Sequence, residues 1–452
     1  MKLFQGKHVR CVTSSRLVIL VLLVSALYAQ AQLPQLPQDV TVFSSAQNVS
    51  NSAGTSTAYQ IAVGPTGDIY VVWLDNTLGY YAVFFSSSVD KGLTFSQPQN
   101  LSNDPAGSGW PEIAVDSAGN INVVWETPYS SNGTAFFSRS SDRGGTFSAP
   151  IAFANNVNGT PNIAVDSTGN IYLSWTDSPS HNIFSGGSSD GGATFSVPVQ
   201  VSNRPPVGSV GIPLIAVDSR GSVDVLWEDC FDYCHVWFNH SSDRGSTFSP
   251  TTSVSGTLEF PSQLGMALDS AGDINAVWNT VPFGYVFLSR SVDGGLTFSS
   301  TTPMTNNTRP FSDPCCAKVA VDPAGGIDMV WTDRSFGNIV FNRTNDDGLT
   351  FSTTKFANAG YPQIAVDSRS GINLVWASAS EILFSRSSDL GTTFSSPQNV
   401  SGNAGGSDVP LIAIDSADGI NVVWGSNSPG NQDVFFSHGV VLRPPSLPVG
   451  LQ

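Results

Sequence analysis

The stretch SSDRGGTF at Ser140–Phe147 decides the fold of this 452-residue chain, because close copies of it recur along the sequence. The shared pattern is Ser or Thr, any residue, Asp, any residue, Gly, any residue, Thr and Phe, and successive copies lie about fifty residues apart. A period in this range indicates one supersecondary unit that is repeated. The seven copies are Ser88–Phe95, Ser140–Phe147, Ser188–Phe195, Ser241–Phe248, Ser291–Phe298, Thr344–Phe351 and Ser387–Phe394.

Each repeat contains four short apolar segments with nothing helical between them. In the second repeat these are IAVD at Ile113–Asp116, INVVW at Ile121–Trp125, AFFSRS at Ala135–Ser140 and TFSAPIAF at Thr146–Phe153. Strands of four to eight residues, bounded by Gly, Asp, Ser and Pro, predict an all-β fold. The Trp that ends the second segment occurs in eight units, at Trp73, Trp125, Trp175, Trp227, Trp278, Trp331, Trp376 and Trp424.

Four antiparallel strands per repeat, arranged radially, describe the blade of a β-propeller. A β-helix uses shorter coils, and tandem β-sandwiches need about a hundred residues per module. The eighth unit lacks a fourth strand, but VFSSAQNVSN at Val42–Asn51 mirrors TFSSPQNVSGN at Thr393–Asn403. We therefore predict a single β-propeller of eight four-stranded blades, with the last blade closed by the N-terminal strand, which removes an exposed edge.

The N-terminal segment has the features of a secretory signal peptide: a basic start, an apolar run at Leu17–Leu27 and an Ala-x-Ala site at Ala29–Ala31. The run is short for a bilayer span, and no later segment is long and apolar enough for a membrane helix. We predict a signal peptide at 1–31, the propeller at 32–442 and a flexible C-terminal tail at 443–452. The protein is expected to be secreted or periplasmic, with no membrane span after signal cleavage.

Charge narrows the choice of partner. Loss of the signal peptide removes four of nineteen basic residues and none of thirty-five acidic ones, which leaves a net charge of −20 and three lysines, Lys91, Lys318 and Lys355. Phosphate backbones repel such a chain, so no nucleic-acid partner is expected. A carbohydrate or a cell-surface protein is the expected partner, and no cofactor or metal site is predicted.

Four cysteines follow the signal peptide: Cys230, Cys234, Cys315 and Cys316. An even number in an exported chain favours disulfides, and a CxxxC metal site is the weaker alternative because no His cluster accompanies it. Spacing alone leaves three pairings open. Local pairing, Cys230 with Cys234 and Cys315 with Cys316, is the simplest expectation.

The repeated turn resembles the Asp-box, or BNR repeat, of the sialidase-like propellers, with Phe where Trp is common in that family. The resemblance covers almost the whole mature chain and implies the architecture rather than an activity, since the repeat also occurs in propellers that are not sialidases. The Asp can accept hydrogen bonds from its own turn, the Gly permits a positive φ, and the Phe is expected to pack between blades. One carboxylate per turn is too few for calcium. The predicted structural residues are Asp90, Asp142, Asp190, Asp243, Asp293, Asp346 and Asp389.

The loops between second and third strands, and those between blades, open on one face, where a ligand site is expected. Two separated carboxylates there would suit a glycoside hydrolase, although capping of loop amides or contact with water explains the same residues. Trp110 and Tyr129 are aromatic candidates for ligand binding on this face. The acidic candidates that follow the second-strand Trp residues are Asp75, Glu126, Asp177, Glu228 and Asp333.

A sialidase would need three arginines on the sugar carboxylate and a Tyr nucleophile activated by Glu. The resemblance would assign the clamp to Arg204, Arg309 and Arg334, and the nucleophile to Tyr233 near Glu228. However, the Arg-Ile-Pro phrase expected before the first box is absent, and two of the three arginines belong to the region of the sixth blade. We therefore predict that the arginines do not converge. The repeat-equivalent arginines of the third strands are predicted to be structural: Arg139, Arg290, Arg343 and Arg386.

Two functional hypotheses follow. The first is a recognition or scaffold module for glycans or surface proteins. The alternative is an exo-sialidase-like glycoside hydrolase that uses acidic residues of the loop face.

Overall fold

The computed structural model describes residues 39–443, except 128–131, 204–208, 231–233, 257–260, 281–283, 305–313, 335, 347, 403–405 and 429. Two compact units are present, and the propeller is the unit Thr41–Val441. Every regular element in the described ranges is a β-strand. None of their residues forms a helix long and apolar enough to cross a membrane. Candidate residues Tyr129, Arg204, Tyr233 and Arg309 lie outside the described residues.

The strands form eight antiparallel sheets, one per repeat. Blade one contains β3 (Ser56–Val63), β4 (Ile69–Asp75), β5 (Ala82–Ser88) and β6 (Gln99–Asn100), and blade two contains β7 (Glu112–Val115), β8 (Ile121–Thr127), β9 (Gly133–Ser140) and β10 (Ile151–Val157). Blade three contains β11 (Asn162–Val165), β12 (Ile171–Thr176), β13 (Ile183–Ser188) and β14 (Val199–Gln200), and blade four contains β15 (Ser209–Val210), β16 (Leu214–Val217), β17 (Val223–Cys230), β18 (Cys234–Ser241) and β19 (Thr252–Ser253).

The second half of the ring repeats this plan. Blade five contains β20 (Pro261–Leu268), β21 (Ile274–Thr280), β22 (Val286–Ser291) and β23 (Thr302–Pro303), and blade six contains β24 (Pro314–Val321), β25 (Ile327–Asp333), β26 (Asn338–Thr344) and β27 (Ser352–Ala357). Blade seven contains β28 (Gly360–Val366), β29 (Ile372–Ser378), β30 (Glu381–Ser387) and β31 (Gln398–Asn399), and blade eight contains β32 (Ser407–Ile414), β33 (Ile420–Ser426) and β34 (Asp433–Leu442), completed by β1 (Val40–Phe43) and β2 (Gln47–Asn48).

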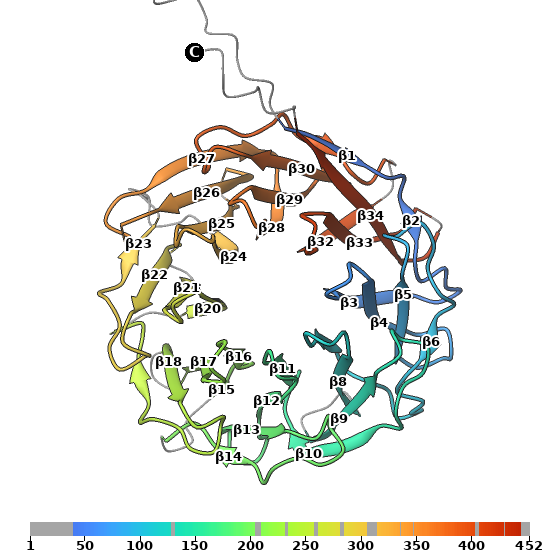
Figure 1. The fold of residues 1–452 in the computed structure, drawn as a ribbon, viewed down its shortest axis with the longest axis vertical. Helices are drawn as coiled ribbons and strands as arrows, with labels where there is room; N and C mark the ends of the chain where they lie inside the picture. The colour runs from blue at the N-terminus through green and yellow to red at the C-terminus, as the bar shows by residue number, and fades with distance from the viewer. Residues whose placement is uncertain are drawn as a thin grey trace, which may run out of the picture. The chain divides into compact units, whose positions relative to one another are not determined.

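The blades follow one another around a ring in chain order (Figure 1). The first full strand of each blade lies at the inner edge, and the last lies at the rim. This confirms the predicted eight-bladed propeller.

The two ends of the propeller pair within blade eight. Strand β34 has β33 on one side and both β1 and β2 on the other. Gln47 lies opposite Phe436, and Asn48 lies opposite Phe435. The predicted closure of the last blade by the N-terminal strand is therefore confirmed.

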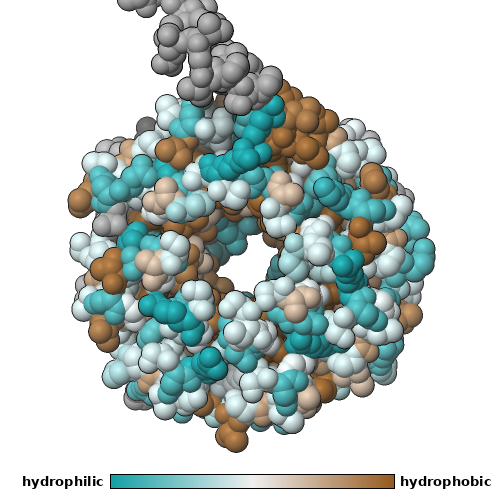
Figure 2. All heavy atoms as spheres, in the orientation of Figure 1, coloured by the Kyte–Doolittle hydropathy of each residue, from teal (hydrophilic) through white to brown (hydrophobic). Residues whose placement is uncertain are grey.

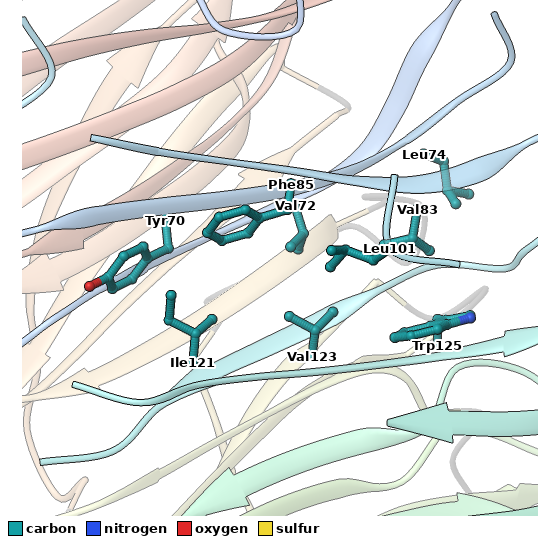
Figure 3. Packing of buried hydrophobic residues seen from close by; sticks show 9 residues of the cluster. All are labelled: Tyr70, Val72, Leu74, Val83, Phe85, Leu101, Ile121, Val123 and Trp125. Carbon is teal, nitrogen blue, oxygen red and sulfur yellow. The ribbon is translucent and has the colours of Figure 1, made fainter. Parts of the chain in front are cut away.

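The core lies between neighbouring blades, because each sheet buries both faces against the next. Figure 3 shows one such layer, in which side chains of β4 and β5 meet Ile121, Val123 and Trp125 of β8. The second-strand Trp residues are each at most 3% exposed. Continuous burial explains why these strands read as apolar runs rather than as an alternating pattern.

The repeated turn has the same hydrogen bonds in each copy. In the first, Asp90 accepts hydrogen bonds from the Thr94 N–H at 2.9 Å and from the Thr94 hydroxyl at 2.6 Å. The Ser88 hydroxyl donates to Asp90 at 2.8 Å and accepts from the Gly92 N–H at 2.8 Å. Hydrogen bonds of this kind lower the pKa of Asp142, Asp190 and Asp346 to about 2.

The glycine of the turn has a second role besides its positive φ. A Cβ on Gly92 would lie 1.9 Å from the ring of Phe436, which belongs to the preceding blade. The turn's own Phe95 packs edge-on against that same ring, with 5.1 Å between centroids. The repeated turn is therefore also an inter-blade contact.

All four third-strand arginines bind a carboxylate of their own blade, including Arg386, which lies 2.6 Å from Asp367. Arg139 lies 3.2 Å from Asp116, and Arg290 lies 3.0 Å from Asp269. Arg343 bonds the buried Asp328 at 2.8 Å. These pairs support the structural role predicted for the set. The cysteines pair locally, Cys230 with Cys234 and Cys315 with Cys316.

Candidate functional site

The inner strands surround a central channel, and Figure 2 shows its opening in the middle of the ring. In every blade the first strand runs away from the loop face, so its first residues lie at the loop-face end of the channel. We call this end the channel mouth. Side chains from several blades come together there.

Five neighbouring inner strands carry a bulge at the channel mouth. The pairing register shifts between Thr57 and Gln60 in β3, and at the equivalent points of β20, β24, β28 and β32. Bulges of this kind re-aim side chains and are common beside functional sites, as are strained backbone positions. In each of them a non-glycine residue with positive φ lies three residues before the apolar triplet that ends the strand: Ala58, Gln263, Cys316, Tyr361 and Val409.

A cavity of about 400 Å³ lies among these bulged strands. Its lining comes from blades one, two, six, seven and eight, and Trp110 at its edge is 54% exposed. A volume of this size is in the range of small-ligand sites. The polar and aromatic residues of the lining are Tyr59, Gln60, Trp110, Lys318, Gln363, Asp408 and Gln432.

Opposite charges lie near the channel mouth, on Lys318, which lines the cavity, and on Glu112, which lies outside its lining. The Gln60 amide donates to a Glu112 carboxylate oxygen at 2.9 Å. Burial raises the pKa of Glu112 to about 7, although the Gln60 hydrogen bond and the positive charge of Lys318 act the other way. Burial also lowers the pKa of Lys318, against the attraction of Glu112. Glu112 and Lys318 come from blades two and six, which face each other across the ring.

Tyr59 is held as a donor at the edge of the cavity. Its hydroxyl donates to the carbonyl oxygens of Asp408 at 2.9 Å and Val409 at 2.5 Å. Burial raises the pKa of Tyr59 far above its ordinary value. The phenol therefore stays protonated and fixes the bulge of β32 beside that of β3.

The acidic residues grouped from the sequence do not form one cluster. Asp75 accepts hydrogen bonds from Ser56 at 2.8 Å and from the Thr77 N–H at 2.8 Å, so it caps its own loop. Asp177 accepts one from the Ser180 N–H at 3.0 Å in the same way. Both are two residues past the strand Trp, whereas Glu126 and Glu228 are one residue past it and so point to the opposite side of their sheets.

Glu126, Glu228 and Asp333 each have a buried carboxylate oxygen without a hydrogen bond among the described residues. Neither carboxylate oxygen of Glu126, which is 1% exposed, makes a hydrogen bond of normal geometry within the described residues. Burial raises the pKa of Glu126 to about 7, opposed by the Gly159 N–H, and burial alone raises the pKa of Glu228 to about 7. Neither residue lines the cavity.

Of the remaining candidates, Trp110 is part of the cavity lining. Asp333 is buried at the end of β25, and Arg334 is exposed just after it. Neither lines the cavity at the channel mouth.

Sequence reasoning missed Tyr59, Gln60, Glu112 and Lys318, because it placed the site on connecting loops. The sequence does contain an indication of two of these residues. Lys318 is one of three lysines after residue 31, and Glu112 opens an otherwise apolar strand. Charged residues at the start of inner strands were the available indication of a polar channel mouth.

No protein-family model matches the chain, and no curated protein matches it in sequence. Among solved structures, an ulvan lyase bound to -[GlcA(1-4)Rha3S]- is 14% identical, with a TM-score of 0.50 over 78% of this chain and 94% of that chain. A protein of unknown function from Dyadobacter fermentans is 14% identical, with a TM-score of 0.48 over 89% of this chain and 99% of that chain. A sialidase from Streptococcus pneumoniae is 13% identical, with a TM-score of 0.41 over 90% and 94% of the two chains.

Identities this low concern the fold alone. The solved structures that match the chain include sialidases and polysaccharide lyases, and the chain itself is an eight-bladed propeller. The predicted propeller fold is confirmed, and the ulvan lyase shares it.

Proposed function

We propose that the propeller is a glycan-recognition module that binds sugar at the channel mouth. The observation that carries the proposal is the exposed Trp110 at the edge of a cavity of about 400 Å³ whose lining combines an apolar surface with several polar side chains. An aromatic face can pack on the apolar C–H face of a sugar ring. An exposed Trp in a concave site is more informative than one on a flat surface.

The rest of the cavity lining can form hydrogen bonds with the hydroxyl groups of a sugar. Gln60, Gln363 and Gln432 each offer an amide donor and an amide acceptor, and Lys318 and Asp408 add a charged donor and a charged acceptor. Several convergent polar groups around one aromatic surface fix the orientation of a polar ligand. The ulvan lyase is a carbohydrate-acting protein of the same fold, which agrees with this proposal.

The test is a glycan array screened with the mature protein, followed by calorimetry on the best ligand. Trp110→Ala should weaken binding by about tenfold or more, since stacking and burial are lost together. The matched control is Phe336→Ala, because Phe336 is 59% exposed and does not line the cavity. Equal affinity of the Trp110→Ala variant and the wild type would reject the channel mouth as the site.

Glycoside hydrolysis is the second candidate, and the raised pKa of Glu112 is the observation that favours it. A carboxylic acid with a pKa of about 7 can donate a proton to a leaving group at neutral pH. In that case the mature protein should turn over a fluorogenic glycoside, and Glu112→Gln should abolish turnover while binding persists. Absence of turnover across a broad substrate panel leaves recognition as the function.

We further propose that the ligand is met outside the cytoplasm. The signal-peptide features of residues 1–31 support export. The two disulfides agree with an oxidising compartment.

A further inference from the structure

Blade three differs from most other blades at one position of its third strand. In six blades, the third-strand residue opposite an Asn or Asp of the second strand is Arg or His. Its side chain reaches the repeated turn of the next blade: a Cβ on Gly191 would lie 3.3 Å from the Arg139 guanidinium carbon. The six residues are Arg139, His240, Arg290, Arg343, Arg386 and His438.

Blades one and three replace this pair. Tyr70 lies opposite Ser87 in blade one, and Tyr172 lies opposite Gly187 in blade three. In both cases the cation comes from the next blade's repeated turn instead, as Arg143 or Arg244. The position therefore receives a basic side chain by one of two routes.

The two replacements differ in how the charge of the arginine is balanced. Arg143 lies 3.5 Å from Asp68, the residue directly before β4. The equivalent residue before β12 is Asn170, which carries no charge. The Tyr172 hydroxyl donates to Asp166 at 2.9 Å, and Asn170 also donates to that carboxylate at 2.7 Å. Arg244 has no ion pair or hydrogen bond with any of the described residues.

Strand β13 also leaves a hole beside Arg244. It has Ser185 where β5 has Phe85, and Gly187 where most blades have Arg or His. A Cβ on Gly245 would meet nothing within 4 Å, whereas at the equivalent Gly295 it would lie 1.9 Å from a Phe ring. The result is a cavity of about 490 Å³ between blades three and four, here called the blade-three cavity.

The lining of the blade-three cavity has an apolar part, with Val197 and Val199, and a polar part that contains the cation. The polar part includes Arg244, Asn170, Tyr172, Ser189, Ser196 and Ser246. Asp243 also contributes, but its carboxylate already accepts hydrogen bonds within its turn, from Thr247 N–H at 2.8 Å and from the Thr247 hydroxyl at 2.6 Å. A guanidinium without a carboxylate partner, surrounded by amide and hydroxyl groups, suits an oxyanion.

We propose that the blade-three cavity is a second binding site, which takes an oxyanion group (sulfate, phosphate or carboxylate) carried by a small polar molecule. Arg244 binds the oxyanion, and the serine hydroxyls and Asn170 contact the rest of the ligand. The cavity is much larger than a single inorganic ion needs, so the anion is part of a larger molecule. The site lies on the face of the repeated turns, away from the channel mouth, and is independent of glycan binding there.

The test is a calorimetric titration of the mature protein with inorganic sulfate, inorganic phosphate, glucuronate and neutral glucose. We expect at least one of the anions to bind and glucose not to bind through this site. Arg244→Gln should weaken that binding by about tenfold or more, because a charge-assisted hydrogen bond is lost. The matched control is Arg143→Gln, which alters the equivalent arginine in the repeated turn of blade two, where Asp68 already balances its charge.

The anion series and the variants answer separate questions. The ranking of sulfate, phosphate and glucuronate identifies the ligand group. Trp110→Ala should leave anion binding unchanged, so failure of the channel-mouth proposal does not affect this one. The proposal is overturned if no anion binds at tens of millimolar, or if Arg244→Gln and Arg143→Gln have the same effect.

Discussion

Asn48 and Asp433 are 385 residues apart in the chain, yet the Asn48 amide donates a hydrogen bond of 2.7 Å to the Asp433 carboxylate. The same carboxylate accepts hydrogen bonds from the Ser50 hydroxyl at 3.0 Å and from the Ser52 N–H at 3.2 Å. Asp433 is 2% exposed. One buried carboxylate thus joins the first strands of the propeller to the last.

Asp433→Ala should therefore loosen the closure of the ring. Three donors lose their acceptor, and we expect the free energy of unfolding to fall by about 2–4 kcal/mol. The measurement is urea denaturation. Asp104→Ala is the control, because within the described residues the Asp104 carboxylate accepts a hydrogen bond only from the Ala106 N–H of its own loop, and its loss should change little. Equal destabilisation by both variants would contradict the role of Asp433.

A pair of glycine variants isolates the inter-blade contact of the repeated turn. Gly295 and Gly245 have similar φ values of +81° and +77°, but only Gly295 lies against a Phe ring. Gly245→Ala should cost about 1 kcal/mol through backbone strain. Gly295→Ala should cost about 1–3 kcal/mol more, because the ring of Phe238 must move. Thermal denaturation of both variants gives the difference, and similar melting temperatures would refute the contact.

Glu126→Gln should remove a pH dependence of stability. Burial raises the pKa of Glu126 to about 7 in the folded protein, above its unfolded value of about 4.5. The folded state then binds the extra proton between these values, so its stability is fully present below about pH 4.5 and is lost as the pH rises through about 7. The variant should be more stable than the wild type at pH 8 by roughly 1–2 kcal/mol, after allowance for solvent screening, and not at pH 4.

Denaturation midpoints at the two pH values provide that measurement. Glu381→Gln, at the turn between β29 and β30, is the matched control and should leave both midpoints unchanged. A gain in stability for Glu126→Gln that is the same at pH 4 and pH 8 would rule out titration of Glu126 as the cause.

Loss of the Cys230–Cys234 disulfide should have a limited effect. The bridge closes a loop with a sequence separation of 4 between β17 and β18. Loop-closure entropy for so short a loop contributes about 2 kcal/mol. The double Ser variant should remain folded with a correspondingly lower midpoint, and peptide mapping without reduction should recover both local pairs. A peptide that links Cys230 to Cys315 or Cys316 would contradict the pairing.

The architecture was predictable because its signals repeat. The strand Trp and the Asp turn occur at a fixed spacing, and the match between Val42–Asn51 and Thr393–Asn403 indicated the closure. Each of these patterns is a short stretch of sequence, so it can be recognised from a single chain. The same reasoning identified the strand-three arginines as structural, and Arg139 and Arg290 do bind strand-one carboxylates.

The candidate sites were less predictable, because both depend on departures from the repeat. The bulge at Ala58 shifts the register of β3, and strand alternation cannot reveal such an inserted residue. The blade-three cavity is formed by side chains that are missing, Ser185 and Gly187 in place of larger residues. Such a space is evident only once the neighbouring blade is in position.

The pairing of β1 and β2 with β34 has a consequence for the order in which the molecule is made. Ser44 and Ser437 meet across a separation of 393 residues, so the first strands must wait for almost the whole chain to be synthesised. A product that stops before Asp433 has no β34, which leaves β33 as an open edge and the first strands without a partner. Open edges pair readily with other chains. The ring can therefore close only in a chain that extends through β34, so closure distinguishes such chains from shorter products.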